Sequence, residues 1–154
     1  MSAIVSQATV ELEYQEASEY GVSCGWEFSP LDAEKQLFTV QLVSSVDQER
    51  YWFEFRYDDY PEKPYLIEPF YPPTGERGTL VCFPKGPDTF FHPSGFICHP
   101  CSRRAYANHG EWAMSNWRVL AGGMNKLRYI LDTFYHRINN QPYYHGRMAK
   151  HAAR

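Results

Sequence analysis

The residues of this chain that could do chemistry gather in FFHPSGFICHPC, residues 90–101. The stretch holds two cysteines, Cys98 and Cys101, and two histidines, His92 and His99, each followed by proline. A thiolate is a nucleophile and a metal ligand, and histidine can move protons near neutral pH. The stretch therefore predicts cysteine chemistry, either nucleophilic catalysis or metal binding.

The two cysteines differ in their neighbours. Arg103 and Arg104 follow Cys101 and would stabilise a thiolate there. Cys98 ends an apolar Phe-Ile pair, which favours burial of its thiol. We therefore expect Cys101 to be the nucleophile, with Cys98 as the alternate or as a resolving thiol.

A zinc site is the weaker alternative. Cys98 and Cys101 form a C-x-x-C, and His92 or His109 could add a ligand, but a structural zinc site needs four. Cys24 and Cys82 have no nearby partner in sequence, so we expect them to be buried and expect no metal. No cofactor is expected, since G-x-x-x-x-G-K-[ST] is absent.

Residues around the cysteines could support the reaction. His92 and His99 could orient the loop or move protons, although a histidine before proline more often packs in a turn. Tyr106 and His109 could cover the site from the following loop. The candidate donors to an oxyanion are Ser94, Asn108 and Asn116.

Length and composition favour one domain, residues 1–154, because 154 residues can bury a full core. The 12 Tyr, 10 Phe and 4 Trp supply large buried area. The N-terminus has no signal-peptide pattern, and no apolar run approaches 18 residues. We expect a cytoplasmic protein with reduced thiols and no membrane contact.

Charge is divided along the chain. Residues 1–70 carry 14 acidic and 4 basic side chains (net −10), and residues 71–154 carry 4 acidic and 11 basic (net +7). We expect the two halves to attract each other across the fold; the alternative is a basic half that faces an acidic partner or nucleotide.

Alternating apolar residues predict strands that would carry the cysteine segment. The predicted strands are residues 22–28, 36–43 and 50–57, with a weaker one at residues 9–14 in place of a short helix over residues 4–20. Five prolines within residues 60–73 predict an extended edge segment or ordered loop. The spacing indicates an antiparallel meander.

One helix is predicted near the C-terminus. Apolar residues recur at helical spacing from Leu120 to Ile138, and Gly122-Gly123 places the start of the regular helix near that pair. Residues 143–154 are basic and aperiodic, so we expect a tail that frays or lies on a partner.

The order of these parts resembles the ubiquitin-conjugating enzymes over roughly residues 36–140. The matching motifs are YPEKPYLI from Tyr60, a His-Pro turn, Gly95-Phe96-Ile97-Cys98, Trp117 and the helical stripe. The resemblance implies an α+β fold, in which an antiparallel four-stranded sheet carries a C-terminal amphipathic helix. It also implies a cysteine that carries an acyl thioester.

The resemblance does not decide between the cysteines. The Gly-x-Ile-Cys step nominates Cys98, whereas the nine residues from His92, against six for Cys98, nominate Cys101. Ser94 stands where the family has an asparagine. An insertion at residues 74–88 and an N-terminal helix expected to be short or absent are further departures.

These departures are typical of divergent bacterial relatives found in antiphage operons of the CBASS type. The implied partner is a cGAS-like nucleotidyltransferase or a ubiquitin-like protein, joined through a C-terminal tail ending in glycine. Partner contacts are expected from Arg103, Arg104, Tyr106 and Trp112, without direct nucleic-acid binding. The alternative is a catalytically inactive binding module.

Overall fold

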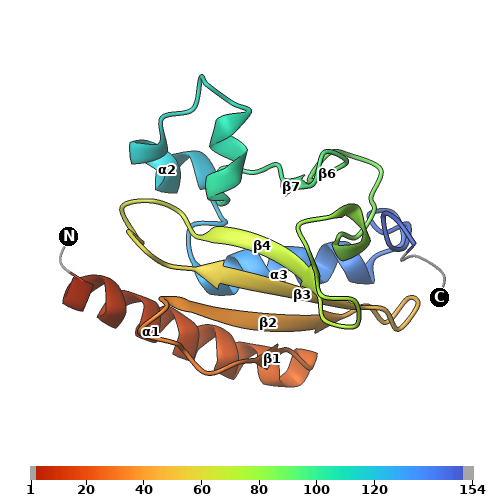
Figure 1. Cartoon of the computed structure of the whole chain (residues 1–154), viewed down its shortest axis with the longest axis horizontal. Coiled ribbons are helices and arrows are strands. Elements are labelled where there is room, and N and C mark those ends of the chain that lie inside the picture. The colour runs from red at the N-terminus through yellow and green to blue at the C-terminus, as the bar shows by residue number, and fades with distance from the viewer. Residues whose placement is uncertain (1–2, 151–154) are drawn as a thin grey trace.

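A computed structural model describes residues 3–150 as an α+β fold built on a five-stranded antiparallel sheet (Figure 1). Its helices are α1 (Ala3–Gly21), α2 (Trp117–Ala121) and α3 (Leu127–Asn139). The sheet contains β1 (Glu27–Phe28), β2 (Leu37–Val43), β3 (Arg50–Arg56), β4 (Leu66–Tyr71) and β5 (Glu76–Arg77), in that order. A separate hairpin is formed by β6 (Phe91–His92) and β7 (Phe96–Ile97). Short 3₁₀ turns are η1 (Val22–Cys24), η2 (Leu80–Cys82), η3 (Arg103–Ala107) and η4 (Met114–Asn116).

The centre of the sheet agrees with the predicted strands at residues 36–43 and 50–57. Alternate residues of β2 and β3 point into the core, as expected for strands with one buried face. Phe38 and Phe55 are paired across the two strands, and their rings stack with centroids 5.3 Å apart. Cross-strand aromatic pairs of this kind help to fix the register.

The edges of the sheet differ from the prediction. The predicted number of four strands is wrong, because the proline-rich segment supplies β4 and the insertion after it supplies β5. Pro69 lies opposite Phe53 within β4, and β5 pairs only with Phe70 and Tyr71. The predicted strand at residues 22–28 is reduced to β1, since a 3₁₀ turn occupies its first half.

The N-terminal segment corrects two expectations, because it is a 19-residue helix rather than a strand at residues 9–14 or a short or absent helix. Val10, Glu13 and Ala17 are buried at helical spacing. Gly21 ends the helix against the Trp26 ring, where there is no room for a Cβ atom. The alternation of TVELEY is local, and the longer helical period decides the structure.

The predicted C-terminal stripe is divided between two helices. Leu127, Ile130, Leu131, Phe134 and Ile138 are all fully buried on α3, as predicted. Leu120 instead belongs to α2 and is partly exposed. Gly122 adopts φ of 57° after α2, a conformation that suits glycine and breaks the helix.

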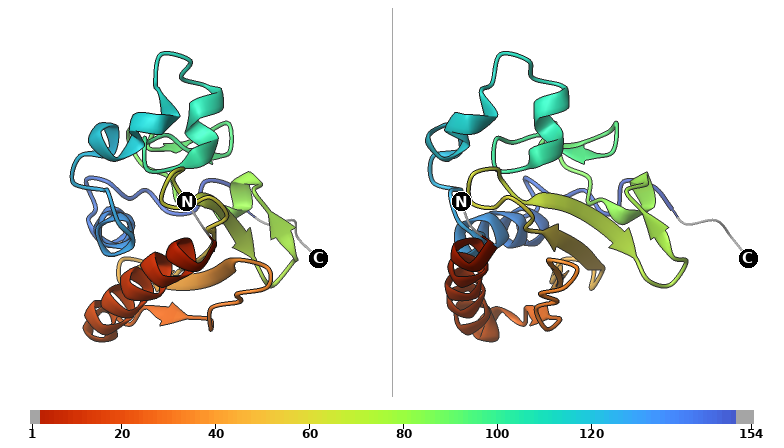
Figure 2. Two further views of the ribbon diagram at one scale, coloured as in Figure 1. Left: turned by 90° about the vertical axis from the view of Figure 1, so that its left-hand side faces the viewer. Right: turned by 60° about the vertical axis from the view of Figure 1, so that its left-hand side comes forward.

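α1 and α3 lie side by side (Figure 2). Tyr20 donates a hydrogen bond to Asp132 at 2.9 Å, and Lys126 pairs with Glu16 at 2.9 Å. Phe134 of α3 contacts Phe53 of β3, with ring centroids 5.0 Å apart. No helix among residues 3–150 is long and apolar enough to cross a membrane.

A buried carboxylate, Glu13 of α1, joins the helices to the loop after β3. Tyr60 donates to it at 2.7 Å, Tyr65 at 3.2 Å and the backbone N–H of Leu127 at 3.0 Å. The Arg118 guanidinium lies 3.6 Å away. Burial raises the pKa of Glu13, and these hydrogen bonds offset part of the shift.

Glu13→Gln is expected to change how stability depends on pH. The raised pKa means that the folded protein binds the proton of Glu13 more tightly than the unfolded chain does. In the unfolded chain a glutamate has a pKa of about 4.3. The free energy of unfolding of the unsubstituted protein should therefore fall, relative to Glu13→Gln, as pH rises through the folded pKa. Urea unfolding between pH 4 and pH 8 measures this, with exposed Glu19→Gln as the control on the same helix. If the free energy of unfolding changes with pH in the same way in the unsubstituted protein and in Glu13→Gln, the raised pKa of Glu13 is contradicted.

Residues 143–150 of the expected tail pack against the rest of the chain, and residues 151–154 lie outside the described residues. Tyr144 is buried, and its hydroxyl lies 2.6 Å from that of Tyr51. The Arg147 guanidinium lies over the rings of Tyr51 and Tyr71 and donates to the carbonyl oxygen of Val81 at 2.8 Å.

Candidate functional site

The cysteine segment lies beyond β4 in Figure 1 and begins with the β6–β7 hairpin. Gly95 makes the turn with φ of 89°, which a residue with a side chain rarely adopts. Beyond β7 the backbone N–H of Cys98 donates to the Phe90 carbonyl oxygen at 2.7 Å. Cys98 is therefore held by backbone hydrogen bonding, while its side chain stays partly exposed.

Cys98 has a histidine beside it. Its Sγ lies 3.2 Å from Nε2 of His109, and Nδ1 of the same ring lies 3.1 Å from Oε1 of Glu111. This is the geometry of a nucleophile, a general base and a carboxylate that orients the base. The side chain of His109 is 27% exposed, so a substrate has access.

Aromatic contacts hold His109 in place. The Trp112 ring stacks on the imidazole with centroids 3.8 Å apart and an interplanar angle of 9°. Tyr106 meets Trp112 edge to face and donates a hydrogen bond to the Pro100 carbonyl oxygen at 2.7 Å. The loop that carries His109 is thereby tied to the segment that carries Cys98.

Electrostatics at this site favour proton transfer over a standing thiolate. Partial burial raises the pKa of the Cys98 thiol. The pKa of Glu111 is lowered by its own backbone N–H and by the hydrogen bond with His109, so this carboxylate stays ionised beside the ring. A thiol that is protonated at neutral pH needs a base at the moment of attack, and His109 is in position to be that base.

The expected burial of the two cysteines is wrong, because the structure buries Cys101 more deeply than Cys98. Cys101, expected to be the reactive thiol, is fully buried, whereas Cys98 is partly exposed. Burial raises the pKa of the Cys101 thiol well above its usual range. A buried, protonated thiol is a poor nucleophile. The geometry thus favours Cys98 over Cys101.

Both histidines of the His-Pro pairs serve the backbone. Nδ1 of His92 accepts the N–H of Ser94 at 3.0 Å, and Nδ1 of His99 accepts the N–H of Cys101 at 3.1 Å. Burial, helped by the charge of Arg137, lowers the pKa of His99 to about 4. His99 is therefore a neutral turn residue, and its Nδ1 orients the loop rather than carrying a proton.

The two arginines after Cys101 have different roles. Arg103 is mostly buried and donates to the Pro64 carbonyl oxygen and to Asp58, which anchors η3 to the loop between β3 and β4. Arg104 is exposed and pairs with Glu68 of β4. Among the described residues, neither forms an ion pair with a thiol, so the charge expected beside Cys101 is directed elsewhere.

The expected oxyanion donors make no hydrogen bond to the thiol in the part of the chain that the structure describes. Ser94, Asn108 and Asn116 are exposed, and no hydrogen bond within residues 3–150 joins their side chains to Cys98. The same residues contain no group of three or more side chains that could hold a metal ion. The zinc alternative therefore gains no support from this geometry.

Glu111 was not among the candidates, and His109 was considered only as a cover or a zinc ligand. The available signal was His109-Gly110-Glu111, a histidine and a carboxylate two residues apart in a loop. Nothing in the spacing shows that the loop returns to Cys98, eleven residues earlier.

Comparison with protein-family models, with curated proteins and with solved structures finds no match to this chain. The arrangement of Cys98, His109 and Glu111 is therefore the main indication of what this chain does.

Proposed function

We propose that this chain is a cysteine-dependent acyl transferase in which Cys98 carries the acyl group as a thioester. The observation that carries the proposal is the distance of 3.2 Å between Cys98 Sγ and His109 Nε2, with Glu111 on the other ring nitrogen. The proposal takes the alternate thiol, Cys98, in place of Cys101 and keeps the expected class of chemistry.

The reaction would run in two steps. His109 Nε2 takes the thiol proton as Cys98 Sγ attacks the carbonyl carbon of the donor, and the same proton then goes to the leaving group. In the second step an acceptor amine attacks the thioester, gives its proton to His109 and displaces Cys98 as a thiolate, which then takes that proton back from His109. Glu111 keeps Nδ1 protonated, so that Nε2 is the acceptor.

A base that can return its proton widens the choice of donor. A thiol leaves a thioester without help, but an amine leaves an amide only when it is protonated. Protonated His109 can supply that proton, so we infer that the site can accept an amide donor as well as a thioester. A separate activating enzyme is then not required by the chemistry of this site.

The order of motifs supports a finer proposal about family and partner. We infer a ubiquitin-conjugating-like domain with α3 packed on the sheet, acting on the C-terminal tail of a ubiquitin-like protein or cGAS-like nucleotidyltransferase in bacterial antiphage defence. The competing proposal is a binding module without catalysis, which the serine at position 94 favours.

Cys98→Ser is expected to abolish a reductant-labile adduct and leave a stable ester or none, because an oxygen ester does not exchange with thiols. The probe is a hexapeptide that ends in glycine and is activated as a C-terminal thioester, and intact-protein mass spectrometry with and without reductant is the measurement. Cys101→Ser is the matched control and should keep the labile adduct, since Cys101 is buried.

A labile adduct that survives Cys98→Ser and disappears in Cys101→Ser would return the role to Cys101. No adduct in unsubstituted protein, with the protein folded by circular dichroism, would favour the binding module.

A further inference from the structure

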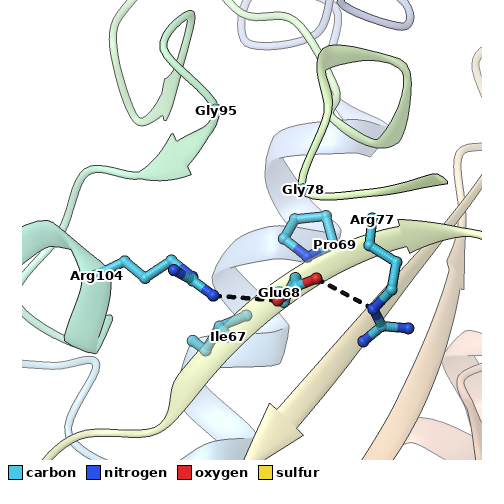
Figure 3. Close-up of a pocket in the computed structure, with 7 residues that line it drawn as sticks. All are labelled: Ile67, Glu68, Pro69, Arg77, Gly78, Gly95 and Arg104. Carbon is cyan, nitrogen blue, oxygen red and sulfur yellow. Dashed lines mark hydrogen bonds and ion pairs between the residues drawn. The ribbon is translucent and has the colours of Figure 1, made fainter.

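A groove lies beside β4, on the side of the cysteine segment (Figure 3). Residues 67–69 of β4 line it, together with Arg77 and Gly78 from the end of β5, Gly95 from the β6–β7 turn, and Arg104 from η3. Its volume is about 230 Å³. The groove therefore brings together four segments that are distant in sequence.

Two arginines meet at a single carboxylate in this groove. Arg77 Nε lies 3.2 Å from Oε1 of Glu68, and Arg104 Nη2 lies 3.1 Å from Oε2. Figure 3 shows the two side chains reaching Glu68 from opposite sides. The two arginines of the groove thus bind one carboxylate, that of Glu68 on β4.

The ion pair between Arg104 and Glu68 can be replaced by a pair between Arg104 and a carboxylate of a ligand. The Arg104 side chain is 48% exposed, and exposed ion pairs contribute little to stability. Arg77 also pairs with Glu54 at 2.7 Å, so it is held more firmly. Among the described residues Arg104 has ion-pair contact only with Glu68, which leaves the rest of its guanidinium fork for an incoming anion.

Backbone forms part of the groove wall. Gly78 and Gly95 have φ of 67° and 89°, and a Cβ atom on Gly95 would lie 3.1 Å from the Gly78 carbonyl oxygen. The absence of a side chain at Gly95 therefore lets the β6–β7 turn and the Gly78 backbone approach each other and form one wall of the groove. A volume of about 230 Å³ suits a short, slim peptide segment rather than a folded surface.

The groove is within reach of the nucleophile. Gly95 precedes Cys98 by three residues, and three residues span at most about 11 Å. The Gly95 end of the groove therefore lies no farther from Cys98 than about three extended residues of a donor peptide would span.

We propose that this groove binds an acidic side chain of the acyl donor, about three residues before the reacting carbonyl, through Arg104. The proposal rests on the proposed function and names its substrate class: a slim C-terminal tail with Asp or Glu near that position. The incoming carboxylate takes the place of Glu68 on Arg104, and Glu68 remains paired with Arg77.

The test uses two peptides, Ala-Ala-Glu-Ala-Ala-Gly and its Gln analogue, each with an amidated C-terminus. Binding to Cys98→Ser protein is followed by amide chemical shifts in an NMR titration, which also locates the site. The Glu peptide should bind about five- to tenfold more tightly, as a charge-assisted hydrogen bond allows, and should shift Gly78 and Gly95. Arg104→Ala should remove the preference, and Glu68→Gln should increase it by freeing Arg104.

Arg50→Ala, which removes a charge at the far end of β3, is the matched control and should leave the preference unchanged. Equal affinity for both peptides, or shifts confined to another face, would overturn the groove. The same peptides as thioesters test the chemistry separately. If the Glu peptide binds more tightly but Cys98 is not acylated, only the proposed function is contradicted. If both peptides acylate Cys98 equally and bind equally, only the proposed role of the groove is contradicted.

Discussion

His109→Ala is expected to slow acylation of Cys98 by about 10²–10⁴-fold at pH 7, which is the usual contribution of a positioned general base. The effect should be large because the raised pKa of the Cys98 thiol leaves little thiolate at that pH. The measurement is the single-turnover rate of thioester formation with the Glu hexapeptide thioester, followed by intact mass.

The pH profile separates loss of a base from loss of structure. Without His109 the attacking species is the free thiolate, so the rate should rise about tenfold per pH unit until the raised thiol pKa is reached. The unsubstituted protein should show a shallower rise, because His109 removes the proton during attack. Glu111→Gln is the graded variant: it keeps the size of the side chain and should slow acylation less than His109→Ala does.

A rate for His109→Ala within threefold of the unsubstituted rate, with the same pH profile, would show that His109 is not the base. Alkylation of Cys98 by iodoacetamide at pH 9 serves as the reference. It needs an exposed thiol but no donor recognition, and it should proceed in both proteins.

Sequence periodicity predicted the parts of the fold whose pattern is long enough to be unambiguous. The strand at residues 50–57 alternates large aromatic residues, and the stripe on α3 repeats through four turns, so both were found. The segment at residues 9–14 is compatible with either period. Only burial of Val10, Glu13 and Ala17 against the rest of the chain decides for the helix.

The difference in burial between Cys98 and Cys101 could not be predicted, because burial of a thiol is a tertiary property. Arg103 and Arg104 favoured Cys101 in sequence, yet Arg103 is directed to Asp58 and Arg104 to Glu68. Cys101 is fully buried, three residues beyond the partly exposed Cys98. Flanking charge predicts reactivity only when the charged groups actually face the sulfur.

The contact between His109 and Cys98 could not be predicted for a related reason. His109 reaches Cys98 because Trp112 stacks on its ring and Tyr106 ties the loop to Pro100. None of these contacts follows from spacing, since each depends on how the loop folds back. The groove beside β4 likewise combines charges from segments that sequence analysis treated separately.

Phe134→Ala is expected to lower the free energy of unfolding by about 3–5 kcal/mol, the usual cost of truncating a buried aromatic residue. Phe134 is fully buried on α3, and its ring lies within 5.0 Å of Phe53 and 5.8 Å of Phe91, centroid to centroid. Removing it would leave a cavity beside the rings of Phe53 and Phe91. For a chain of this size the expected fall in thermal midpoint is roughly 6–20 °C.

Leu120→Ala is the matched control, because Leu120 was predicted on the same stripe but lies partly exposed on α2. It should change the free energy of unfolding by about 0.5 kcal/mol or less. Urea unfolding of both variants measures the difference, and circular dichroism of the native state checks that each folds. Equal losses in the two variants would mean that the stripe forms one continuous buried helix and that the break at Gly122 is misplaced. A negligible loss in Phe134→Ala would instead contradict the placement of α3 in the core. It would also contradict the contact between Phe134 and Phe91 that supports the hairpin leading to Cys98.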